Sequence, residues 1–94
     1  MTSLKSFDLV IAAARIVDGC GNPWYRGDIG VRGDRIAAIG PPRSLRGDTI
    51  HDAEERYAVP GFIDPHTHSD LAMLVHRRAE TALLQGVTTQ VTGN

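Results

Sequence analysis

The segment Ala58-Val-Pro-Gly-Phe-Ile-Asp-Pro-His-Thr-His-Ser-Asp70 combines a short apolar run with two closely spaced histidines. Its apolar residues Val59, Phe62 and Ile63 predict a short strand buried on both faces, as in a parallel sheet covered by helices. Successive side chains on a strand point to opposite faces. One face of this strand is therefore expected to carry every second residue, namely Phe62, Asp64, His66 and His68.

Two imidazoles at positions i and i+2 of a strand can converge on one cation, so His66 and His68 are the candidate metal ligands. Imidazole suits zinc and other first-row metals. A catalytic zinc site has three protein ligands plus water, so two histidines alone leave the ion under-coordinated. Pro65 cannot donate to a sheet ladder, and we interpret it as the point where the strand gives way to the site.

Asp64 is the third candidate of this stretch, and two roles are open for it. It lies one pleat deeper than His66 and could orient a ligand imidazole through an outer hydrogen bond. Alternatively, it is a buried carboxylate that backbone donors satisfy.

The residues that follow predict a second strand after a helix. Ala79, Ala82 and Leu83 have the i, i+3, i+4 spacing of a helix over residues 78–85. Gly86 stands where a helix end favours a left-handed residue. The β-branched run Val87–Thr92 predicts the next strand. Strand, helix and strand with short joins form a βαβ unit, and in barrels of such units the active site lies at the carboxyl ends of the strands.

The first 57 residues predict several short strands with turns between them, an all-β module. Gly33-Asp34 is expected to be a two-residue hairpin turn of type I′ or II′. The alternating run Asp28–Arg32 predicts a half-exposed strand. We therefore expect Arg26 and Asp28 on an exposed strand face, with no catalytic residue in this module.

The motifs of the second half resemble those of a known family. Pro60-Gly-Phe-Ile-Asp-Pro-His-Thr-His68 is similar to the first barrel strand of the metal-dependent amidohydrolase superfamily. His66-Thr-His-Ser-Asp70, Gln85-Gly-Val-Thr-Thr89 and Thr92-Gly-Asn94 together resemble its N-acyl-D-amino-acid deacylase (D-aminoacylase) branch. The resemblance extends from Asp8 to the last residue.

The resemblance implies an α/β fold with an all-β N-terminal module. Residues 1–57 would form part of a small β-sandwich, and residues 58–94 would start an incomplete TIM-type (β/α)8 barrel. It also implies one or two zinc ions in the complete enzyme, with His66 and His68 as ligands. A bridging cysteine, further histidines and a general-base aspartate would follow beyond residue 94, so no catalytic base is expected within the chain.

Length and composition set further limits. A (β/α)8 barrel needs about 250 residues, and the chain has 94, so we expect the N-terminal piece of a longer enzyme that requires the rest of the barrel. The net charge of −1 does not indicate nucleic-acid binding. No apolar run is long enough to cross a membrane. The single cysteine, Cys20, excludes an internal disulfide and favours the cytoplasm.

Three functional hypotheses follow. The first is hydrolysis of the linear amide of a small-molecule N-acyl-D-amino acid, giving a carboxylate and a free D-amino acid. The second is another amidohydrolase chemistry, either cyclic amide opening as in dihydropyrimidinases and dihydroorotases or deamination. The third is non-enzymatic: a truncated fragment that is inactive on its own.

Overall fold

The computed structural model describes residues 6–67 and 78–91. Contacts within the chain divide it into two units, Met1–Pro60 and Gly61–Asn94. The sequence placed this boundary three residues earlier, after Tyr57. Ala58 instead pairs with Ile16 in the sheet of the first unit.

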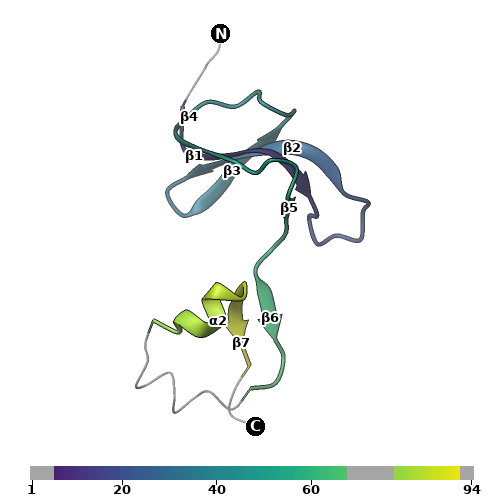
Figure 1. Ribbon diagram of the computed structural model, residues 1–94, viewed down its shortest axis with the longest axis vertical. Coiled ribbons are helices and arrows are strands. Elements are labelled where there is room, and N and C mark those ends of the chain that lie inside the picture. Colours follow the sequence, from purple (N-terminus) through teal and green to yellow (C-terminus); the bar gives the residue numbers. More distant parts are fainter. Residues whose placement is uncertain (1–5, 68–77, 92–94) are drawn as a thin grey trace. The chain divides into compact units, whose positions relative to one another are not determined.

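The first unit is a mixed five-stranded sheet (Figure 1). Its strands are β1 (Phe7–Ile16), β2 (Tyr25–Arg32), β3 (Arg35–Gly40), β4 (Gly47–Asp52) and β5 (Tyr57–Ala58). The order is β3-β2-β1-β4, and β5 also pairs with β1. β2 runs antiparallel to β1 and β3, whereas β4 and β5 run parallel to β1. Among the described residues of the first unit, the expected all-β organisation is confirmed.

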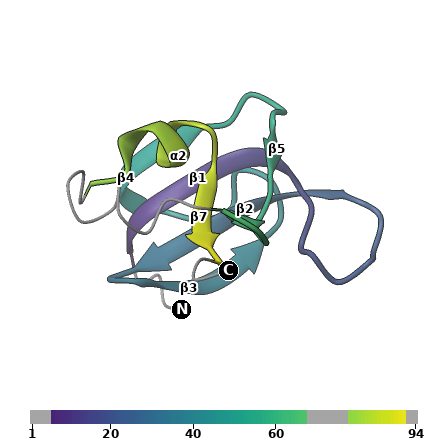
Figure 2. The same ribbon diagram turned by 90° about the horizontal axis from the view of Figure 1, so that it is seen from below.

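β1 is the central strand of this sheet, as Figure 2 shows. Phe7–Ile16 forms one continuous strand that contains a bulge. The register against β2 shifts between Ile11 and Ala14, and Ala13 has a φ of 55°. This left-handed conformation is rare for alanine and costs roughly 1–2 kcal/mol. Hydrogen bonds hold it in place, since the Ala13 N–H donates to Asp28 and its carbonyl accepts from Glu55.

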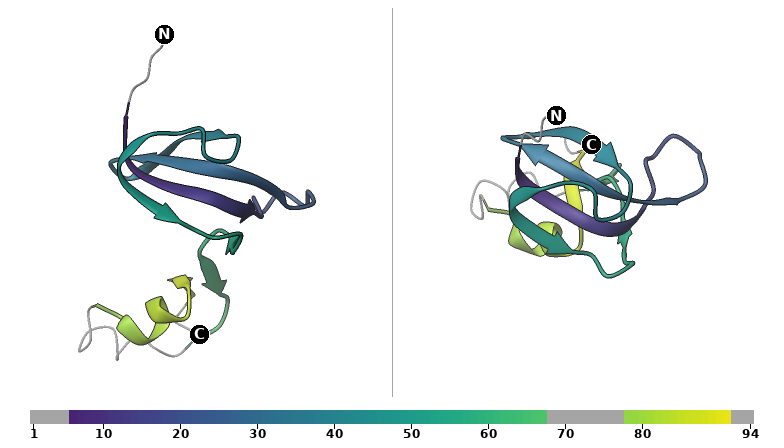
Figure 3. Two further views of the ribbon diagram at one scale, coloured as in Figure 1. Left: turned by 45° about the horizontal axis from the view of Figure 1, so that its top comes forward. Right: turned by 90° about the horizontal axis from the view of Figure 1, so that it is seen from above.

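The turns of the first unit follow their local sequence. Gly33-Asp34 forms the expected two-residue turn between β2 and β3, with Gly33 at a φ of 59°. Asp8 supports the turn by accepting the Gly33 N–H at 2.6 Å. The glycine-rich connection between β1 and β2 is a long loop that extends beyond the sheet (Figure 3).

Asp28 contradicts its prediction, because it is fully buried rather than exposed. Its Oδ1 accepts the N–H groups of Ala13 at 2.9 Å and Arg43 at 2.8 Å. Its Oδ2 accepts those of Ser44 at 2.9 Å and Leu45 at 3.1 Å. The loop after β3 therefore folds over the face that strand alternation assigned to solvent. Arg26, two residues earlier, is exposed as predicted.

Burial alone raises the pKa of the Asp28 carboxyl, since it disfavours the charged form. The four backbone donors outweigh this effect and hold the pKa below its usual value. Asp28 thus remains a carboxylate inside the sheet, and it joins the β1 bulge to the loop after β3.

Apolar side chains form two small clusters along β1. Ala14 and Ile16 pack with Ile29 and Ala53 in one cluster. Phe7, Val10 and Ala12 form the other, against which Ala38 and Leu45 pack.

The second unit contains β6 (Phe62–Asp64), α2 (Glu80–Leu84) and β7 (Val87–Gln90). β6 and β7 pair in parallel, as expected for a βαβ unit. The helix and the second strand lie within the predicted ranges but are shorter. Gly86 follows the helix with a φ of 87°, which confirms its predicted left-handed conformation. No helix in residues 6–67 and 78–91 is long and apolar enough to cross a membrane.

The predicted burial of the decisive strand is wrong within this chain. Val59, Phe62 and Ile63 have exposed fractions of 46%, 54% and 65%. The physical reason is that a strand buried on both faces needs neighbours on both sides. In the part of the chain that the structure describes, β6 pairs only with β7.

Candidate metal site

The region around His66 begins where β6 ends, at Asp64. Pro65 is the first residue beyond the strand, as its missing N–H predicted. His66 therefore lies outside the strand, so alternation alone does not place it on the face of Phe62 and Asp64. The position of His66 must have another cause.

That cause is visible in the hydrogen bonds around Val91, the residue after β7. The Val91 N–H donates to the Asp64 carbonyl at 2.9 Å, and the Val91 carbonyl accepts the Thr67 N–H at 3.1 Å. Pro65 and His66 lie between these two attachment points. The pairing with the second strand thus continues past β6 but skips two residues, which form a bulge.

A third hydrogen bond closes the bulge from within. The Asp64 Oδ1 accepts the His66 N–H at 3.2 Å, which is an Asx turn. Asp64 is half-buried and His66 is exposed. Asp64 thus accepts one backbone donor, as in the second alternative derived from the sequence, but it is half-buried rather than buried.

His68 lies outside the described residues, so the convergence of the two imidazoles stays a prediction. Among residues 6–67 and 78–91, no group of three or more His, Cys, Asp or Glu side chains is placed to hold a metal ion. The exposed imidazole of His66 has the donor chemistry that zinc accepts. The described residues therefore fit a contribution to a metal site, with further ligands needed.

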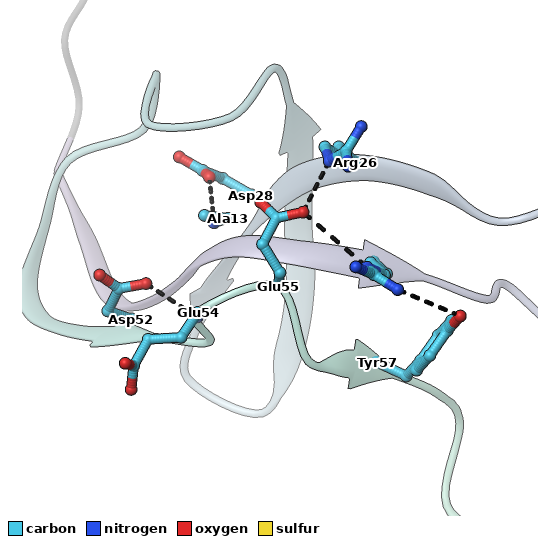
Figure 4. Close-up of polar contacts among 8 residues, drawn as sticks. Ala13, Arg26, Asp28, Asp52, Glu54, Glu55 and Tyr57 are labelled. Atoms are coloured by element: carbon cyan, nitrogen blue, oxygen red, sulfur yellow. Dashed lines mark hydrogen bonds and ion pairs between the residues drawn. The ribbon is translucent and has the colours of Figure 1, made fainter.

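Polar chemistry also gathers in the first unit, where the sequence indicated no function. Glu55 Oε1 lies 2.6 Å from Arg26 Nε and 3.8 Å from Arg15 Nε (Figure 4). The guanidinium of Arg15 lies over the rings of Trp24 and Tyr57, with 5.1 and 5.4 Å to their centroids. The hydrogen bond from Arg26 is the main cause that lowers the pKa of Glu55.

These ion pairs join β1 and β2 to the segment that precedes β5. Sequence spacing could not reveal these contacts, because Arg26 and Glu55 are 29 residues apart and Arg15 and Tyr57 are 42 apart. Cys20 is exposed, and its N–H donates to Asp18 within the β1–β2 loop. His51 is exposed on β4.

No protein-family model matches the chain. Several curated proteins do. It is 48% identical over 90 residues to a D-aminoacylase of Alcaligenes xylosoxydans xylosoxydans, which covers 96% of this chain and 19% of that protein. It is 45% identical over 87 residues to an N-acyl-D-aspartate deacylase of the same organism, with 93% and 18% covered.

Solved structures agree with the sequence similarity. A D-aminoacylase structure superposes with a TM-score of 0.86 at 43% identity, covering 94% of this chain and 19% of that one. An N-acyl-D-glutamate deacylase from Bordetella bronchiseptica gives 0.86 at 40% identity, with 96% and 19% covered. The chain matches the N-terminal region of the N-acyl-D-amino-acid deacylases, within the amidohydrolase superfamily.

Two facts qualify what this deacylase-like chain shares with its relatives. It spans about a fifth of the length of the curated deacylases it matches, 19% and 18%. Relatives with other activities are similar over the same region. An adenine deaminase of Cenarchaeum symbiosum is 40% identical over 88 residues, with 89% of this chain and 14% of that protein covered.

Metal centres appear in the matched structures of the relatives. One D-aminoacylase structure describes a binuclear metal centre with one-metal activation and second-metal attenuation. The N-acyl-D-glutamate deacylase structure holds zinc and a phosphonate inhibitor that mimics the tetrahedral intermediate of its reaction.

Proposed function

We propose that this chain forms the N-terminal portion of a metal-dependent amidohydrolase that hydrolyses the linear amide of N-acyl-D-amino acids. The products are a carboxylate and a free D-amino acid. The observation that carries the proposal is the 48% identity to a D-aminoacylase over 96% of this chain, together with a TM-score of 0.86 to a solved D-aminoacylase.

The proposal gives each unit a place in the complete enzyme. The sheet of the first unit would be part of a small β-sandwich, and β6-α2-β7 would be the first βαβ unit of a (β/α)8 barrel. The parallel pairing of β6 with β7 supports this assignment. The exposed apolar side chains of Phe62 and Ile63 also support it, because barrel strands are buried on both faces.

In the proposed site, His66 and His68 are two ligands of a zinc centre of one or two ions. A bound metal ion of this kind polarises a carbonyl and supplies hydroxide near neutral pH. The chain's own contribution is to present neutral imidazoles, because protonated histidine does not bind metal. With no third ligand among the described residues, the 94-residue chain alone is expected to be inactive.

Deamination and cyclic amide opening are the alternative activities. The adenine deaminase similarity favours the first. An L-hydantoinase from Arthrobacter aurescens, with a TM-score of 0.74 at 27% identity and 92% and 20% of the two chains covered, favours the second. Their identities, 40% and 27%, are below that of the D-aminoacylase, so deacylation is the activity we propose.

The test is a turnover assay of the complete enzyme with N-acetyl-D-amino acids, their L-enantiomers, adenine and hydantoin. Stereospecific release of the D-amino acid is expected. His66→Ala combined with His68→Ala should reduce kcat/KM by more than about 100-fold, since even the loss of an outer-shell partner costs 10- to 100-fold.

His51→Ala is the matched control, because it removes an exposed imidazole from β4 of the first unit. It should leave kcat/KM unchanged. Near-normal turnover by the double variant would show that His66 and His68 do not bind the catalytic metal. Turnover of adenine or hydantoin without that of N-acetyl-D-amino acids would replace the proposed activity by the corresponding alternative.

A further inference from the structure

Asp64 carries an inference about how the metal ligand His66 is positioned, and this inference rests on the proposed metal role of His66. A strand that continued through Asp64 would aim His66 by alternation alone. In the structure β6 ends at Asp64, and His66 lies in a two-residue bulge. Its position is therefore set by whatever holds the bulge.

Among the residues that the structure describes, three hydrogen bonds hold the bulge, and they differ in kind. Two are backbone bonds of Val91, to the Asp64 carbonyl and from the Thr67 N–H, and they fix the two ends of the bulge. The third joins the Asp64 carboxylate to the backbone N–H of His66 inside the bulge. Pro65 has no N–H, so the N–H of His66 is the donor that remains between the two ends.

We infer that Asp64 is a positioning residue that acts on the backbone of His66 and thereby fixes the direction of its imidazole. The bond needs a short side chain with an oxygen two residues before the donor, which aspartate and asparagine share. The negative charge is not required. A carboxylate that oriented a metal-bound ring by accepting its N–H would use that charge, so substitutions can separate the two roles.

Asp64→Asn keeps an oxygen acceptor for the His66 N–H, whereas Asp64→Ala removes it. Asp34→Ala is the matched control, because it deletes an exposed carboxylate from the β2–β3 turn of the other unit. These variants are made in the complete enzyme, freed of metal, and His66→Ala in the same enzyme defines which part of any metal uptake depends on His66.

The first measurement is hydrogen exchange of the His66 amide by NMR, which does not depend on a metal. Loss of the bond in Asp64→Ala should speed exchange about fivefold, the effect of one ordinary hydrogen bond. Asp64→Asn and Asp34→Ala should exchange like the wild type.

The second measurement is calorimetric titration with Cu²⁺, which binds imidazole sites more tightly than Zn²⁺. Asp64→Ala should weaken His66-dependent uptake about tenfold or more, as loss of an outer-shell partner does. Asp64→Asn should restore the affinity.

Unchanged exchange of the His66 amide in Asp64→Ala would overturn the inference, as would an Asp64→Asn variant that exchanges slowly but binds copper as weakly as Asp64→Ala. If uptake depends on His66 but is unaffected by Asp64→Ala, the positioning role falls and the proposed metal site stands. If the wild type takes up no copper through His66, both fall.

Discussion

The two units of the chain differ in how their polar and apolar groups are satisfied. The first unit buries Asp28 and two apolar clusters, and its buried carboxylate has four donors. In the described residues of the second unit no side chain is buried, and Ile63 and Leu84 are exposed by 65% and 87%. The first unit therefore carries its own core, whereas the second presents apolar surface that a complete fold would have to cover.

This difference matches the division of tasks that we propose. A unit that satisfies its own groups can serve as a rigid support. Active sites at the ends of barrel strands instead combine residues from several strands, so one βαβ unit shows only a fraction of such a site. The contrast leads to three predictions. The first two concern the buried carboxylate of the first unit, and the third concerns the strand pair of the second.

The largest effect is expected from Asp28. Asp28→Ala leaves four backbone N–H groups without their acceptor, one in a buried hydrogen bond and three in part-buried ones. Unfilled buried donors make this one of the severe classes of substitution, with a loss of about 3–5 kcal/mol of unfolding free energy. Urea unfolding followed by the fluorescence of Trp24, the single tryptophan, measures it.

Asp28→Asn retains one oxygen acceptor, so its loss should be smaller, and Asp34→Ala in the exposed turn should be nearly neutral. An Asp28→Ala variant as stable as the wild type would show that the loop after β3 does not depend on the carboxylate, and the contrast between the units would lose its basis.

Acid is expected to have the next largest effect, through the same carboxylate. The pKa of Asp28 is lower in the folded chain than in the unfolded chain, where it is near 3.9. As the pH falls, the unfolded chain therefore binds the proton before the folded chain does. Stability from Asp28 is thus complete above the unfolded pKa and is lost as the pH falls through the folded pKa. The urea concentration at the midpoint of unfolding should therefore decrease when the wild type is brought below about pH 4.

The same pH series with Asp28→Asn isolates this contribution, because Asp18, Asp52 and Glu55 also have lowered pKa values and titrate in both proteins. The difference between the two curves should shrink as the pH falls. A difference that is independent of pH would mean that Asp28 does not titrate below its unfolded value.

The smallest effect concerns Gly86 in the second unit. Its φ of 87° favours glycine, and an added Cβ would lie 3.2 Å from the Phe62 ring. Gly86→Ala should cost about 1–2 kcal/mol and speed hydrogen exchange of the Phe62 amide, which donates to the Gly86 carbonyl. Gly21→Ala is matched, because its φ is 83° and nothing lies within 4 Å of the added atom. The Phe62 amide should exchange faster in Gly86→Ala only. Equal exchange rates in the two variants would show that a Cβ at residue 86 does not strain the contact with Phe62.

Sequence reasoning succeeded where the signal is local. The Gly33-Asp34 turn and the left-handed Gly86 follow from the freedom of glycine at positive φ, which no distant contact has to supply. The order of strand, helix and strand around residues 62–90 followed from periodicity in the same way. The strand end before Pro65 followed from the missing N–H of proline.

It failed where a distant segment decides the environment of a residue. Asp28 was assigned to solvent because alternation says which residues share a face but not what covers that face. A signal was nevertheless present in the neighbouring glycines. An added Cβ at Gly27 would lie 2.8 Å from the Gly40 carbonyl, and one at Gly30 would lie 2.9 Å from the Phe7 ring. Glycines inside a strand indicate such close approaches.

The order of the amino acids was enough to predict the turns, the element order, the family likeness and His66 and His68 as candidate ligands. These features depend on the conformational limits and donor atoms of single residues and their neighbours. The burial of Asp28 and the bulge that Val91 and Asp64 close around His66 became known only from the folded chain. Both depend on hydrogen bonds between segments 15 or more residues apart, and the local sequence does not encode which distant backbone group will fill a donor or an acceptor.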